Sequence, residues 1–179
     1  MKPWVSVVDA GYRTIVRPIM FGSHRGDPEA VHDTMIAGLA RFSRSPLAIS
    51  AARLLAGSTG SPVTVAGIRF PGRVGLAAGL DKNGRAVLAW QALGFGFAEL
   101  GTVTAQAQPG NDKPRVFRLP RSKALINRTG FNNAGAARLH HELSQLGVYS
   151  RGGGAGIPIG ISIGKTKVAP VEHAVADYP

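Results

Sequence analysis

From Pro62 onward the chain alternates short apolar runs with segments of helical spacing, and this alternation is the feature that most limits its fold. Short apolar runs bounded by glycine predict buried strands. Strands that alternate with helices predict an α/β fold with a parallel sheet. The predicted strands cover residues 63–66, 68–70, 74–78, 97–102 and 157–163, the predicted helices residues 83–93 and 132–146, and a predicted hairpin residues 115–119 and 124–126.

The beginning of the chain lacks this alternation and predicts helices instead. Residues 3–20 have apolar side chains at helical spacing, and Pro18 and Gly22 are expected to close this helix. Asp27 is expected to cap a second helix that has Pro28 at its first position.

A third predicted helix, residues 46–55, precedes a break rich in glycine and serine. We therefore expect two domains, a helical extension of residues 1–60 and an α/β domain of residues 61–179. The amphipathic helices of the extension are flanked by arginines, which permits two interpretations. They either pack on the main body or lie on a lipid surface with the arginines facing head groups, and periodicity alone leaves both open.

The net charge of +11 is compatible with a polyanionic partner. The basic residues are spread evenly, however, without the clustered stripe of nucleic-acid-binding proteins, so we expect no nucleic-acid partner. The absence of cysteine excludes disulfides and thiolate metal sites, and we expect no metal site. No run approaches the ~18 apolar residues that span a bilayer, and no signal-peptide pattern is visible. A cytosolic chain is expected, unless part of it lies on a membrane surface.

Polar residues gather where three of the predicted strands end. Ligands bind at the carboxyl ends of strands in parallel α/β proteins, so this pattern predicts a ligand site. Small side chains before Lys82 let a flat ring approach the backbone, and a lysine suits a carboxylate. The residues concerned are Gly79, Asp81 and Lys82 after the first strand, Thr102 and Thr104 at the second, and residues 164–167 at the third.

Amide side chains add to this predicted site. Asn127, Asn132 and Asn133 supply donors and acceptors that match a pyrimidine-like imide or a carboxylate. Plainer interpretations exist for single residues. Asp81 and Lys82 could form a surface ion pair, which is worth about 0–1 kcal/mol, and Asn133 could simply begin a helix.

Three long segments share a specific pattern: GLAAGLDKNG (75–84), GFGFAELGTVTAQAQPGNDKPRVFRL (94–119) and ALINRTGFNN (124–133). Together they closely resemble dihydroorotate dehydrogenases of the membrane-associated, quinone-dependent class. The segment GDPEAVHDTMIAGLARF (26–42) resembles the helical extension of that class. The resemblance implies a helical hairpin followed by a (β/α)₈ TIM barrel, of which this chain would supply about three strands.

The resemblance also implies a reaction and its partners. Dihydroorotate would be oxidised to orotate in pyrimidine biosynthesis, with FMN as cofactor and a membrane quinone as electron acceptor. In this family a base removes the C5 proton while C6 delivers hydride to the flavin, and the redox chemistry is the cofactor's. Residues 1–60 would bind peripherally to the cytoplasmic face of the cell membrane.

The resemblance assigns roles to individual positions of this chain. Lys82 would contact both the flavin and the carboxylate of the substrate. The implied flavin-contacting residues are Ala78, Gly79, Leu80, Asp81, Lys82, Thr102 and Ser162, and the implied substrate-contacting residues are Lys82, Asn127, Arg128, Thr129, Gly130 and Phe131.

Three departures from the family pattern change what we expect. Ser162 replaces an asparagine, so flavin binding is expected to be weaker by about 1 kcal/mol. Thr129 replaces a larger apolar residue, which loosens the pocket. The catalytic base, a serine, is expected beyond Pro179, so the 179-residue chain alone is expected to be inactive. It is then either the first part of a dehydrogenase or a fragment that acts at most as a membrane-surface or partner-binding module.

Overall fold

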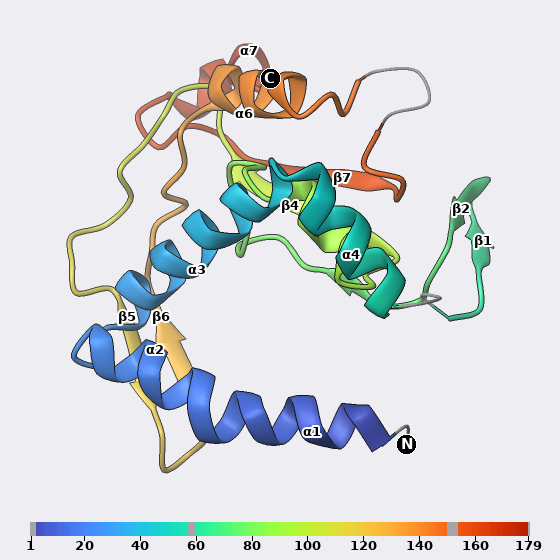
Figure 1. Ribbon diagram of the computed structural model, residues 1–179. Coiled ribbons are helices and arrows are strands. Elements are labelled where there is room, and N and C mark those ends of the chain that lie inside the picture. Colours follow the sequence, from blue (N-terminus) through green and yellow to red (C-terminus); the bar gives the residue numbers. More distant parts are fainter. Residues whose placement is uncertain (1–2, 57–59, 150–153, 179) are drawn as a thin grey trace. The chain divides into compact units, whose positions relative to one another are not determined.

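The computed structural model describes residues 3–56, 60–149 and 154–178 (Figure 1). It divides into two compact units. Unit 1 consists of Met1–Met35 and Asp112–Arg128, and unit 2 of Ile36–Asn111 and Thr129–Pro179. The division of the chain at residue 60 into an extension and a barrel stays a prediction.

Unit 2 contains a parallel sheet with the strand order β3-β4-β7. The strand β4 (Phe97–Val103) lies in the middle and pairs in parallel with β3 (Gly75–Leu76) and with β7 (Ile159–Ile163). The predicted α/β fold with a parallel sheet is therefore confirmed. Together with the helices that precede it, this arrangement is that of an incomplete (β/α)₈ barrel.

Helices and a hairpin accompany this sheet in unit 2. The two strands predicted before β3 are confirmed and pair with each other in antiparallel fashion, whereas η2 and α7 at the end of the chain were not predicted. The elements of unit 2 outside the parallel sheet are α4 (Pro46–Ala56), β1 (Val63–Val65), β2 (Ile68–Phe70), α5 (Val87–Ala92), α6 (Ala136–Gln145), the 3₁₀ turn η2 (Val171–His173) and α7 (Ala174–Asp177).

The core of unit 2 lies between β4 and its neighbouring helices. Leu100 and Val103 of β4 are at most 1% exposed, as is Val87 of α5, and Leu143 of α6 is 2% exposed. A glycine is required at the pairing of β3 with β4, because a Cβ atom on Gly75 would lie 2.2 Å from the ring of Phe97. Burial of large aliphatic side chains, at roughly 1.5–3 kcal/mol each, stabilises the sheet against these helices.

In unit 1 the first helix continues further than the sequence predicts. The helices α1 (Pro3–Gly11) and α2 (Arg17–Ser23) are joined by the π-helical turn η1 (Tyr12–Val16) and form one continuous rod (Figure 1). The predicted helix is confirmed, but the expectation that Pro18 closes it is wrong. Proline has no N–H to donate, and the wider π turn before Pro18 accommodates it within the helix.

This rod exposes apolar side chains. Val7, Val8, Ile15 and Ile19 are between 59% and 72% exposed. Among the described residues, no helix combines the length and the apolar character needed to cross a bilayer. An exposed apolar face on a helix is typical of segments that lie in a membrane interface.

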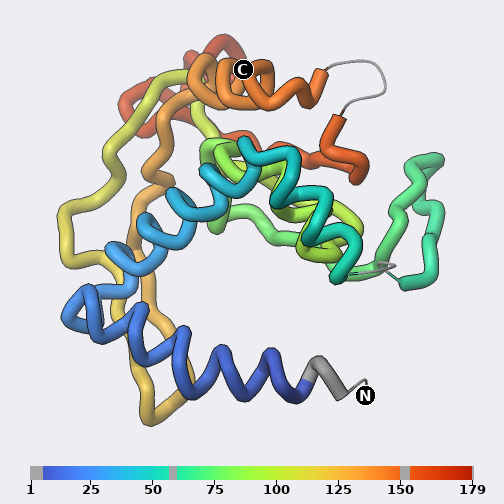
Figure 2. The backbone as a smooth tube through the Cα atoms, viewed as in Figure 1, coloured from blue at the N-terminus to red at the C-terminus, as the bar shows by residue number. Residues whose placement is uncertain are grey.

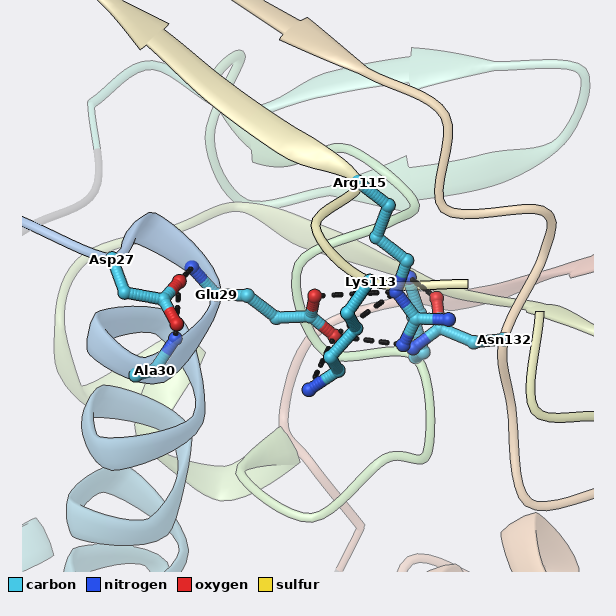
Figure 3. A network of polar contacts seen from close by, with 7 residues as sticks. Asp27, Glu29, Ala30, Lys113, Arg115 and Asn132 are labelled. Carbon is cyan, nitrogen blue, oxygen red and sulfur yellow. Dashed lines mark hydrogen bonds and ion pairs between the residues drawn. The ribbon is translucent and has the colours of Figure 1, made fainter. Parts of the chain in front are cut away.

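The helix α3 (Pro28–Ser43) begins as predicted. The Asp27 side chain accepts hydrogen bonds from the backbone N–H groups of Glu29 at 2.9 Å and Ala30 at 3.3 Å (Figure 3). This N-cap satisfies two of the donors that a helix start leaves free, and such a cap is worth about 1 kcal/mol. The prediction that Asp27 caps a helix with Pro28 at its first position is confirmed.

A cluster of charges joins the start of α3 to the hairpin of unit 1, which consists of β5 (Val116–Leu119) and β6 (Ala124–Asn127). The Arg115 guanidinium donates to the Glu29 carboxylate through Nη2 at 2.7 Å and through Nε at 3.2 Å, and the Lys113 ammonium lies 3.2 Å from it (Figure 3). The side chains of Glu29 and Arg115 are only 13% and 7% exposed. The hydrogen bond from Arg115 holds the pKa of Glu29 below its ordinary value, although burial opposes this shift.

Replacing Glu29 by glutamine is expected to lower the free energy of unfolding by about 2 kcal/mol, because the buried Arg115 loses the carboxylate with which it interacts most strongly. Since the folded-state pKa of Glu29 is lowered, the stabilisation is present above the unfolded-state pKa and is lost as the pH falls through the folded-state pKa. The stability difference between wild type and Glu29→Gln should therefore shrink as the pH falls from about 6 to about 3. Urea denaturation measures it. The exposed Glu172→Gln serves as the control, and equal losses in both variants would contradict the prediction.

Candidate functional site

The carboxyl ends of the three parallel strands meet at one edge of the sheet, here called the carboxyl edge. The N–H of Gly79, after β3, donates to the carbonyl of Gly101 in β4 at 2.8 Å. The hydroxyls of Thr102 in β4 and Ser162 in β7 lie 2.9 Å apart in a hydrogen bond. The structure thus brings together the predicted site residues Gly79, Thr102 and Ser162, from three separate stretches of the chain.

Gly79 leaves room for a ligand at this edge. Its φ of +105° belongs to the region that favours glycine, and a Cβ atom built on it would meet no other atom within 4 Å. A flat ring can therefore approach the backbone here. Ala78 and Leu80, the half-buried neighbours of Gly79, belong to the same segment after β3.

Asp81 faces the core instead of the solvent. It is 1% exposed, and its carboxylate accepts hydrogen bonds from the N–H groups of Arg85 and Ala86, both at 2.9 Å, and from Trp90 Nε1 at 3.0 Å. Burial raises the pKa of Asp81, and the hydrogen bonds only partly offset this. The interpretation of Asp81 as half of a surface ion pair is wrong.

These hydrogen bonds also explain why α5 begins later than predicted. The backbone donors of Arg85 and Ala86 are bound to Asp81, and regular helix starts only at Val87. Asn83, expected to start the helix, instead accepts a hydrogen bond from the N–H of Ala134 at 2.9 Å. The turn between β3 and α5 is thus held from both sides, and Lys82 lies within it.

Lys82 contacts the segment that precedes α6. Its ammonium donates to the Asn132 side-chain oxygen at 2.5 Å, and both residues are half-buried. A cation and an amide, fifty positions apart in the sequence, therefore lie side by side. Together they offer the donors that a carboxylate or an imide requires.

Asn133 has a structural role. It is 8% exposed, its oxygen accepts from the N–H of Gly135 at 2.8 Å, and its amide donates to Thr104 Oγ1 at 2.9 Å and to the Phe131 carbonyl at 2.8 Å. Asn133 does not begin a helix, because α6 starts at Ala136 with Gly135 at its N-cap and has no side-chain cap. A side-chain amide committed in this way orders the loop between Phe131 and Gly135.

The remaining predicted substrate residues fall in different units. Thr129, Gly130 and Phe131 belong to unit 2 with Lys82, and Phe131 is 62% exposed. Asn127 and Arg128 belong to unit 1, where Asn127 pairs with Val116 and the Arg128 N–H donates to the Arg115 carbonyl at 2.8 Å. That Asn127 and Arg128 join Lys82 at one site stays a prediction.

Two further residues order the loops at the carboxyl edge. Gln108 lies within the motif of residues 94–119 but received no role from the sequence, because its side chain binds the backbone of two neighbouring loops. Lys165, at the predicted third strand end, donates to the carbonyls of Thr166 at 2.8 Å and Ala169 at 2.5 Å. Its ammonium therefore stabilises the loop after β7.

These features are those of the α/β barrel class, whose members bind ligands at the carboxyl ends of their parallel strands. Comparison with known proteins gives the family, since the family model described as dihydroorotate dehydrogenase matches residues 61–179. The chain belongs to the dihydroorotate dehydrogenase family.

Individual relatives agree with this assignment. The chain is 51% identical over 169 residues to a dihydroorotate dehydrogenase (quinone) of Chloroflexus aurantiacus, which covers 93% of this chain and 45% of the relative. It is 54% identical over 154 residues to one of Mycolicibacterium smegmatis, covering 84% of this chain and 41% of the relative. The crystal structure of ligand-free dihydroorotate dehydrogenase from Eimeria tenella is similar with a TM-score of 0.68 and 38% identity, over 84% of this chain and 40% of that one. The chain thus spans less than half the length of these relatives.

Replacing Asp81 by asparagine is expected to lower the free energy of unfolding by about 2–3 kcal/mol, because an NH₂ group then faces backbone and indole N–H donors. The folded-state pKa of Asp81 is raised. The contribution of Asp81 to the free energy of unfolding is therefore largest below the unfolded-state pKa, and it declines as the pH rises through the folded-state pKa. The stability difference between wild type and Asp81→Asn should therefore narrow between about pH 3 and pH 7. Urea denaturation at several pH values tests this, with the exposed Asp112→Asn as control. A difference that widens with pH would refute it.

Proposed function

We propose that this chain supplies part of a quinone-dependent dihydroorotate dehydrogenase, which oxidises dihydroorotate to orotate in pyrimidine biosynthesis. The observation that carries the proposal is the meeting of Lys82 and Asn132 in unit 2, at 2.5 Å. The family membership supports it, as does the identity of the relatives as dihydroorotate dehydrogenases (quinone).

The carboxyl edge fits a flat flavin ring, and we assign FMN as the cofactor. The backbone at Gly79 is open on the side where a Cβ atom would project, and the Thr102–Ser162 hydroxyl pair has a donor and lone pairs left for a ligand. The residues that would hold the ring are Ala78, Gly79, Leu80, Lys82, Thr102 and Ser162. FMN, when bound, supplies the hydride-accepting chemistry.

Asp81 acts within this site as a positioning residue. Its buried carboxylate holds the turn after β3, and Lys82 is the next residue in that turn. The ammonium of Lys82 then forms charge-assisted hydrogen bonds with the carboxylate of dihydroorotate, which fixes the orientation of the substrate. Asn132 and the neighbouring residues Thr129, Gly130 and Phe131 complete the wall, and we assign Asn127 and Arg128 to the same pocket.

Residues 1–60 are proposed to bind the cytoplasmic face of the cell membrane peripherally, where the quinone acceptor resides. The exposed apolar side chains of α1, η1 and α2 support this proposal, as do the arginines along them. Apolar burial and attraction to anionic head groups together drive such binding. Of the two interpretations left open by the sequence, we therefore favour the one in which the exposed apolar face lies on a lipid surface.

Replacing Lys82 by methionine in the full-length protein is expected to lower dihydroorotate-dependent quinone reduction about 100-fold or more, because the carboxylate loses its charged partner. A quinone-reduction assay and the flavin absorption spectrum of the purified protein provide the measurements. Lys123→Met, which changes an exposed lysine in the turn between β5 and β6, is the matched control. Undiminished turnover in Lys82→Met would refute the role of Lys82, and a wild-type protein free of flavin would refute the proposed function itself.

Replacing both Ile15 and Ile19 by aspartate is expected to reduce partitioning onto anionic liposomes at least about tenfold, because the apolar face then carries charges. Co-sedimentation with vesicles measures the partitioning. The control replaces Val171 and Val175, which are 76% and 92% exposed in unit 2, in the same way. Equal binding of both double variants and the wild type would show that the rod does not contact lipid.

A further inference from the structure

Three loops of unit 2 meet at the carboxyl edge, and Gln108 connects them. The first loop, residues 104–111, follows β4 and contains Gln108. The second loop, residues 129–135, precedes α6, and the third, residues 164–170, follows β7. The second loop accepts hydrogen bonds from the Gln108 side chain, and the third loop donates one to it.

The side-chain amide of Gln108 uses both its donor and its acceptor. Its Nε2 donates to the carbonyls of Gly130 at 3.3 Å and Phe131 at 3.1 Å. Its Oε1 accepts from the N–H of Lys167 at 2.9 Å. A glutamate of the same length would place a carboxylate against two carbonyl oxygens, and an asparagine would be one methylene too short. The position therefore matches an uncharged amide at this distance from the backbone.

The backbone of Gln108 also binds the second loop, at Asn133. Its N–H donates to the Asn133 carbonyl and its carbonyl accepts from the Asn133 N–H, both at 3.0 Å. Gln108 thus binds Gly130 and Phe131, which precede Asn132 in the sequence, and Asn133, which follows it. Asn132 is the residue that accepts the hydrogen bond from the Lys82 ammonium.

We propose that Gln108 is a positioning residue, which sets the loop of residues 129–133 so that Asn132 lies against Lys82. The inference rests on the proposed function, because Lys82 and Asn132 are the groups assigned to the substrate. Gln108 acts through the backbone of Gly130, Phe131 and Asn133, which lie on both sides of Asn132 in the sequence. Since its amide also binds Lys167, the positions of the second and third loops depend on the same side chain.

The structural half of the proposal is tested by hydrogen exchange in the full-length protein. Gln108→Glu is expected to accelerate exchange of the backbone amides of residues 129–133 about tenfold, while α6 keeps its protection. Gln106→Glu is the matched control, since it makes the same chemical change on an exposed side chain of the same loop. Unchanged exchange of residues 129–133 in Gln108→Glu would overturn the proposal.

The functional half is tested by titration calorimetry with orotate. Gln108→Glu and Asn132→Ala are each expected to weaken orotate binding about tenfold, and the double variant is expected to be little weaker than either, because Gln108 acts through Asn132. The flavin content should stay that of the wild type. Additive losses in the double variant, or binding by Gln108→Glu within about twofold of wild type, would overturn the proposal.

The two measurements also separate this inference from the proposed function. A wild-type protein that binds no orotate refutes the proposed function, while the exchange experiment still decides whether Gln108 orders the loop. If Gln108→Glu does not fold, Gln108→Met keeps the side-chain length without the carboxylate and takes its place. If both variants fail to fold while Gln106→Glu folds, Gln108 is a general stability residue and the proposal is overturned.

Discussion

The parallel pairing of β4 with β3 on one side and β7 on the other is the constraint on which the rest of unit 2 depends. Parallel strands place their carboxyl ends at one edge, so the loops that follow them are brought together whatever their separation in the sequence. Burial of Leu100 and Val103 in the core stabilises this pairing. The contacts between Gly79 and Gly101 and between Thr102 and Ser162 are consequences of that pairing.

Buried polar side chains then order the loops that the strands bring together. Burying an unpaired carboxylate or amide would cost several kcal/mol, but Asp81, Thr104 and Asn133 each find partners in backbone and neighbouring side chains. Asp81 orders the turn after β3, and Asn133 orders the loop before α6. Neighbouring residues can therefore differ in role: the Asp81 carboxylate faces the core, whereas the adjacent Lys82 contacts Asn132.

Elements with local causes were predictable from the sequence. Asp27 caps α3 because its side chain reaches donors two and three residues ahead, and the β5–β6 hairpin pairs neighbours in the chain. Element boundaries set by distant partners were not predictable. The start of α5 depends on Asp81 binding the donors of Arg85 and Ala86, and the passage of the first helix through Pro18 depends on a π turn that apolar spacing does not show.

The sequence by itself determined the family, the parallel α/β class and the kinds of residue at the strand ends, because long motifs and short-range hydrophobic patterns are visible in one dimension. Only the tertiary structure decided which of these side chains face inward. It assigned Asp81 and Asn133 to the interior, joined Lys82 to Asn132, and brought Gln108 against two other loops. The physical reason is that hydrogen-bond partners far apart in the chain are chosen by packing, and no sequence spacing encodes them.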